Sequence, residues 1–121
     1  MRALILVDHG SRRPEAGEVL LAMVELLRRS VPGDMEVRAA HMEIESPSIA
    51  EAIDACAAEG ATEIIVSPYM LAHGRHASED VPRLARAAAQ GHPGLRLRVT
   101  ECLGAHPALA QVILERAGLA L

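Results

Sequence analysis

Lysine is absent from this 121-residue sequence, and all 12 basic side chains are arginines. The absence excludes Schiff-base chemistry and a Walker-type phosphate loop, because both need a lysine amine. Phenylalanine and tryptophan are also absent, and Tyr69 is the single aromatic residue. The core must therefore be aliphatic, and a flat ligand would have to lie on aliphatic surface. The net charge of -4 argues against a nucleic-acid partner.

Cysteine and long apolar runs are scarce as well. Cys56 and Cys102 form neither a C-x-x-C pair nor a disulfide framework, so we expect small core side chains in a reducing compartment. No apolar run approaches the roughly 20 residues of a membrane helix, and the N-terminal segment lacks the features of a signal peptide. We expect a cytoplasmic protein with no membrane partner, folded as a single domain over residues 1–121.

Short apolar runs alternate with segments of helical periodicity along the chain. The predicted strands are 3–7, 35–42, 63–67 and 95–100, and the predicted helices are 14–30, 47–58, 79–90 and 107–117. Three of these helices are expected to begin at a proline, which is favoured at the first helical position: Pro14, Pro47 and Pro107. In the first helix, Ala16, Val19, Leu20 and Val24 are expected on one buried stripe.

Alternation of this kind predicts an α/β fold with a four-stranded parallel sheet, helices on both faces and strand order 2-1-3-4. Ligands of such sheets bind beyond the carboxyl ends of the strands, where the strand order reverses. The loops that follow three of the predicted strands contain His9, Glu43, His73 and His76. Imidazole and carboxylate suit a divalent transition metal, and neutral imidazole can accept a proton near pH 7. Loop arginines suit an anionic substrate.

Each of these polar residues also has a structural interpretation, since single histidines at strand ends are usually solvated or hydrogen-bonded. Glu43 and Glu45 can favour the start of the next helix through their charge. We expect His41 to be structural, His92 to lie in a solvent-exposed turn, and His106 to start the last helix.

Two motifs and their spacing resemble one known family. Val7–Arg12 (VDHGSR) resembles the HGSR opening of the class II chelatases, which include the sirohydrochlorin and cobalt chelatases. Ser67–Leu71 (SPYML), with the following GRH at 74–76 and EDVP at 79–82, resembles the second signature of that family. Met42-Glu43 and the PSI at 47–49 resemble the stretch between the two signatures. The agreement covers nearly the whole chain, in order and at matching spacing.

The resemblance implies a flavodoxin-like chelatase lobe in which His9 and His76 bind the incoming metal. It implies insertion of a divalent metal into sirohydrochlorin, in cobalamin or siroheme synthesis, with His9, His76 and Glu43 as catalytic candidates. Cobalt is favoured as the substrate metal, with iron or nickel as alternatives, and no permanently bound cofactor is expected. His73 does not belong to the family pattern. The candidate residues for binding the tetrapyrrole are Ser11, Arg12, Arg13, Tyr69 and Arg75.

A single lobe resembles the short members of the family, which form homodimers, so we expect a homodimer around the macrocycle. Two other functions stay open. A non-enzymatic carrier of metal or tetrapyrrole would use the same residues. A histidine-type phosphatase would place an arginine before His9, whereas Asp8 occupies that position and would repel phosphate.

Overall fold

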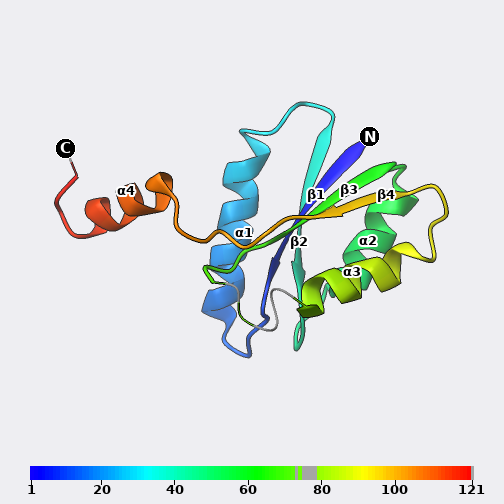
Figure 1. Ribbon diagram of the computed structural model, residues 1–121, viewed down its shortest axis with the longest axis horizontal. Coiled ribbons are helices and arrows are strands. Elements are labelled where there is room, and N and C mark those ends of the chain that lie inside the picture. The colour runs from blue at the N-terminus through cyan, green and yellow to red at the C-terminus, as the bar shows by residue number, and fades with distance from the viewer. Residues whose placement is uncertain (73, 75–78, 121) are drawn as a thin grey trace.

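The computed structural model describes residues 1–72, 74 and 79–120. Strands and helices alternate without exception in the order β1 (Arg2–Asp8), α1 (Pro14–Arg28), β2 (Met35–His41), α2 (Ile49–Ala58), β3 (Glu63–Pro68), α3 (Val81–Ala89), β4 (Arg96–Val99) and α4 (Pro107–Arg116) (Figure 1). The strands form one parallel sheet in the order β2-β1-β3-β4, which confirms the predicted fold class and strand order. Asp8 pairs with His41 and Val7 pairs with Pro68, so three carboxyl ends lie at the same edge.

The two faces of the sheet are covered by different helices. Alternate residues of β1 point to opposite faces: Ile5 and Val7 join the core under α2 and α3, whereas Leu6 joins the core under α1. The α1 core also contains Leu20 and Val24. Helices therefore cover both faces of the sheet, as expected from the buried apolar strands.

Besides shifts of one or two residues at the ends of the other helices, two details of the predicted helices are wrong. α2 begins at Ile49 rather than Pro47, because Ser48 forms a capping box: its hydroxyl accepts from the Glu51 N–H at 3.1 Å, and the Glu51 carboxylate accepts from the Ser48 N–H at 2.9 Å. In α1, Val19 is 54% exposed although helical spacing placed it on the buried stripe, and Ala16 is exposed too. The face of α1 that meets the sheet is narrower than the apolar stripe.

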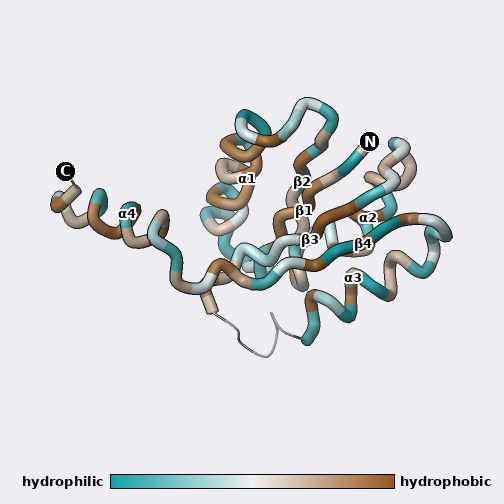
Figure 2. Tube along the Cα trace, turned by 45° about the horizontal axis from the view of Figure 1, so that its top comes forward, coloured by the Kyte–Doolittle hydropathy of each residue, from teal (hydrophilic) through white to brown (hydrophobic). Residues whose placement is uncertain are grey.

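The last helix differs from the others because no residue of α4 is buried. It extends away from the sheet and its three companion helices (Figure 1), and hydrophobic residues are spread along it (Figure 2). Ile113 is 67% exposed, Val112 44% and Leu114 40%. His106 begins the helix as predicted, with its ring nitrogen accepting from the Ala108 N–H at 3.0 Å. Over the part of the chain that the structure describes, no helix is long and apolar enough to cross a bilayer.

Candidate functional site

The loop after β1 is joined to the loop after β2 by backbone hydrogen bonds. The Met42 N–H donates to the Asp8 carbonyl at 2.9 Å, and the Glu43 N–H donates to the His9 carbonyl at 3.2 Å. These bonds continue the parallel pairing of β1 and β2 past the Asp8–His41 pair. His9 and Glu43 therefore lie side by side at the carboxyl end of the sheet, and both residues are exposed.

Gly10 permits this close approach of the two loops. Its φ is +91°, and a Cβ placed there would lie 1.8 Å from the carbonyl oxygen of Glu43. Only glycine fits such a contact without moving backbone, and only glycine adopts this φ readily. The Gly10 N–H donates to the Asp8 carboxylate at 3.0 Å, which closes the turn around His9.

A buried histidine connects the same two loops through side chains. His41 is 7% exposed, and its Nδ1 lies 2.6 Å from Asp8 Oδ1 and 3.5 Å from Glu45 Oε2. The Glu45 carboxylate also accepts from the Ser11 N–H at 2.9 Å. Glu45 therefore contacts the His9 loop, a role that was not predicted from its position before α2. The sequence signal for this role was the spacing of Glu45, which follows Glu43 and lies four residues after His41.

The remaining predicted site residues differ in how the structure places them. Ser11 is half-buried, and its hydroxyl accepts from the Arg13 N–H at 3.0 Å, while Arg12 and Arg13 are exposed. Tyr69 is half-buried and packs on the α1 core, with its N–H donating to the Val7 carbonyl. Its contact with substrate stays a prediction. His73, Arg75 and His76 lie outside the described residues, so their places in the site stay predictions as well.

No trio of His, Cys, Asp or Glu side chains able to hold a metal occurs within residues 1–72, 74 and 79–120. A metal bound at the His9 loop would therefore take fewer than three such side chains as ligands from the described residues. On α2, burial raises the pKa of the Cys56 thiol.

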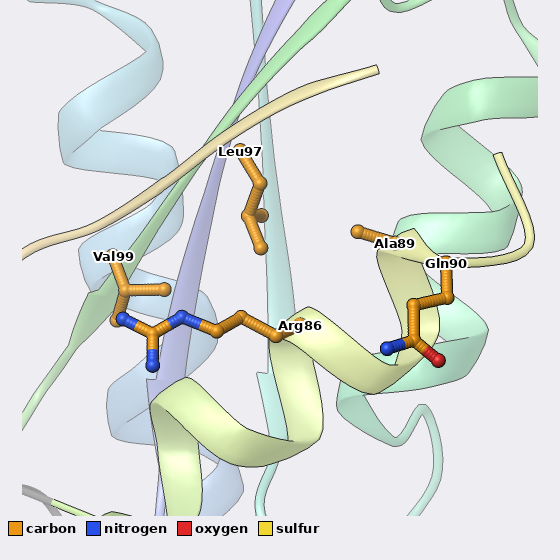
Figure 3. Close-up of a pocket in the computed structure, with 5 residues that line it drawn as sticks. All are labelled: Arg86, Ala89, Gln90, Leu97 and Val99. Atoms are coloured by element: carbon orange, nitrogen blue, oxygen red, sulfur yellow. The ribbon is translucent and has the colours of Figure 1, made fainter. Parts of the chain in front are cut away.

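Hollows on the two faces of the sheet differ in how closely they approach these loops. One of about 310 Å³ lies between α3 and β4, where Arg86 extends towards Val99 beneath Leu97 (Figure 3). It contains no residue of the loops described above. The other, of about 370 Å³, lies between α1 and the β2–α2 loop, and its lining includes His41 and Glu45. The second hollow therefore reaches the side chains that connect the two loops.

Fold and site together define a flavodoxin-like lobe with imidazole, carboxylate and guanidinium groups at the strand-order reversal. The CbiX family model matches residues 3–120, and the chain belongs to that family.

The chain is similar to chelatases of different lengths. It is 39% identical to a chloroplastic sirohydrochlorin ferrochelatase of Arabidopsis thaliana, covering 93% of this chain and 50% of that protein. It is 35% identical to a sirohydrochlorin cobaltochelatase of Methanothermobacter thermautotrophicus, covering 93% of this chain and 88% of that protein. The sirohydrochlorin chelatase SirB of Bacillus subtilis, solved with cobalt, superposes with a TM-score of 0.89 at 27% identity, over 97% of this chain and 50% of that one. The chain thus spans about half the length of two of these relatives.

Proposed function

We propose that this chain inserts a divalent metal into a sirohydrochlorin-type tetrapyrrole, with cobalt as the favoured metal and iron or nickel as alternatives. The observation that carries the proposal is the pairing of His9 with Glu43 at the carboxyl end of the sheet, fixed by backbone hydrogen bonds. The relatives named above support the same class of substrate, with both iron and cobalt represented among them.

The proposed site meets the chemical demands of metal insertion. The metal substrate must exchange water for protein ligands that hold it weakly enough to release it, which imidazoles such as His9 and His76 allow. The two inner N–H protons of the macrocycle must leave, and the Glu43 carboxylate or an imidazole can accept them. Arg12 and Arg13 are exposed beside His9 and can pair with the carboxylates on the rim of the macrocycle.

Visible spectroscopy of purified protein with sirohydrochlorin and Co²⁺ tests the activity. We expect multiple turnovers above the rate in buffer, and loss of most of that rate in His9→Ala. His92→Ala is the matched control, because His92 pairs with Asp54 in a turn before β4, away from the loops at the carboxyl edge. A wild-type rate equal to buffer refutes the enzyme. A reaction that stops at one equivalent identifies a carrier instead.

The metal is tested by comparing kcat/KM for Co²⁺, Fe²⁺ under anaerobic conditions, and Ni²⁺ with the same protein. We expect the highest value for Co²⁺. Intrinsic affinities follow the metal series more than the ligand set, so turnover is compared at equal free metal concentration. A higher kcat/KM for Fe²⁺ would assign the chain to siroheme synthesis.

The proposed working form is a homodimer in which α4 docks on a second copy. None of the residues of α4 is buried, although Ile113 and its neighbours are apolar. On the α1 side of the sheet, β3 and β4 are incompletely covered: Ile65 of β3 is only half-buried, and Arg98 of β4 is exposed. The Bacillus relative has a chain about twice as long, and in the proposed dimer a second copy of this chain would correspond to its other half.

Sedimentation equilibrium of Ile113→Asp tests the dimer. We expect a wild-type dimer and a monomeric variant, because a carboxylate in an apolar contact is costly. Gln111→Asp is the control, since position 111 lies about 200° around the helix from position 113. A wild-type monomer, both alone and with tetrapyrrole, would contradict the dimer.

A further inference from the structure

We infer that His41 is a positioning residue, which holds the His9 loop and the Glu43 loop at the separation that metal transfer requires. The inference rests on the proposed function and assigns a task to a side chain outside the two signature motifs. His41 lies at the last paired position of β2, opposite Asp8 of β1. Each loop begins directly after one of these two residues.

Through Asp8, His41 is connected to both chain neighbours of His9. Its Nδ1–H donates to Asp8 Oδ1 at 2.6 Å, and the same carboxylate oxygen accepts from the Gly10 N–H at 3.0 Å. Asp8 and Gly10 are the two chain neighbours of His9. The backbone conformation of His9 is therefore fixed by the Asp8 carboxylate, and the orientation of that carboxylate depends on His41.

A second carboxylate extends the connection to the loop of Glu43. Glu45 Oε2 lies 3.5 Å from Nδ1 of His41 and accepts from the Ser11 N–H at 2.9 Å. The Glu45 N–H donates to the Glu43 carbonyl at 2.8 Å. One imidazole thus stands between two carboxylates, and each of those carboxylates holds a backbone N–H of the His9 loop.

Burial makes this connection stiff. The side chain of His41 is 9% exposed and that of Asp8 is 16% exposed, so water competes weakly for their hydrogen bond. An apolar side chain at position 41 would remove a donor and leave two nearby carboxylates to repel each other. The loops would then shift against each other. When the groups that hold the reactants move by about 1 Å, the reaction rate can fall roughly 100-fold.

Three variants separate positioning from packing. His41→Asn places an amide N–H where Nδ1–H donates, whereas the amide of His41→Gln reaches further and His41→Leu has no donor. We expect kcat to fall about 10- to 100-fold in His41→Leu and His41→Gln, which is the usual loss when a group that orients a metal ligand is removed. In His41→Asn, kcat should be largely retained. A packing role predicts the reverse order for Leu and Asn, because Leu suits an apolar environment better. His92→Asn is the matched control: its ring also lies 2.6 Å from a carboxylate, that of Asp54, but on the surface.

Calorimetric titration of each folded variant with Co²⁺ alone gives a readout that does not depend on turnover. We expect weaker binding in His41→Leu and His41→Gln, and binding near wild type in His41→Asn and His92→Asn. Equal Co²⁺ affinity and equal kcat in all four variants would overturn the inference and leave the proposed function intact. A wild type that binds Co²⁺ without turning over would refute the proposed function, and the order of the variant affinities would still decide the role of His41.

Discussion

Replacing Gly10 with alanine should damage the site more than any other single methyl group added to a glycine of this chain. A Cβ at position 10 would lie 1.8 Å from the Glu43 carbonyl oxygen, whereas ordinary contacts begin near 3.4 Å. The loops must therefore separate by roughly 1.5 Å. That shift breaks the hydrogen bond from the Glu43 N–H to the His9 carbonyl, which is 3.2 Å long. The damage falls on the two residues proposed to handle metal and protons.

The expected cost has two parts. A positive φ costs an alanine about 1–2 kcal/mol, and loss of the inter-loop hydrogen bond with its local packing costs about 1–2 kcal/mol more. Gly94→Ala measures the first part alone, because Gly94 has φ +89° and nothing within 4 Å of an added Cβ. The melting temperature of Gly10→Ala should therefore be about 4–8 °C below that of Gly94→Ala at equal protein concentration.

Activity should separate the two variants further. Gly94→Ala should keep the wild-type kcat, whereas Gly10→Ala should lose about 100-fold, because the reacting groups move by more than 1 Å. Thermal unfolding followed by circular dichroism and the visible chelatase assay measure the two effects on the same samples. Equal melting temperatures and equal rates for the two variants would refute the reasoning, since the inter-loop contact would then have no consequence.

Ile53→Ala should lower the free energy of unfolding, measured by urea denaturation, by about 2–5 kcal/mol, because Ile53 is fully buried. Leu21→Ala is the control: its side chain is 58% exposed, so the free energy should change by less than about 1 kcal/mol. Ser48→Ala should cost about 0.5–2 kcal/mol by removing the cap of α2. Hydrogen bonds from the Ser48 N–H and from the Ser46 and Ser48 hydroxyls lower the pKa of Glu51. The ionised Glu51 therefore stabilises the fold above the ordinary pKa of a glutamate, and this stabilisation is lost as pH falls through the lowered pKa. Urea titrations at several pH values should find this pH dependence weakened in Ser48→Ala. Cys56 is buried and its thiol pKa is raised, so a colorimetric thiol reagent should modify it only after unfolding.

The strand order, and with it the common edge at which β1 and β2 end, followed from the sequence because local and global signals agree. Continuous apolar runs identify strands covered on both faces, and glycine and proline mark most helix ends. Short connections then leave few topologies for a parallel sheet. The sequence did not fix the exact start of α2. Pro47 precedes the N-cap residue Ser48, and both proline and serine are common at the start of a helix.

Two features could not be predicted because they depend on tertiary placement. The contact of His41 with Asp8 depends on the register of β1 against β2, which pairs these residues across the sheet. A slip of one residue would turn His41 to the other face. The direction of α4 depends on the segment between Thr100 and His106, and the apolar pattern of the helix is the same whether it packs on its own sheet or on another.

Under the proposed function, one short loop holds both the metal and the ring. His9 would bind the metal, and Arg12 and Arg13 would pair with the rim of the macrocycle three and four residues later. The distance between metal and ring is then set by the backbone of this loop, which Gly10 and the hydrogen bonds to Asp8 and Glu45 fix. A change that loosens the loop should therefore lower kcat more than it raises KM for either substrate. Each substrate alone can follow a moving loop, whereas transfer requires both to be held at once.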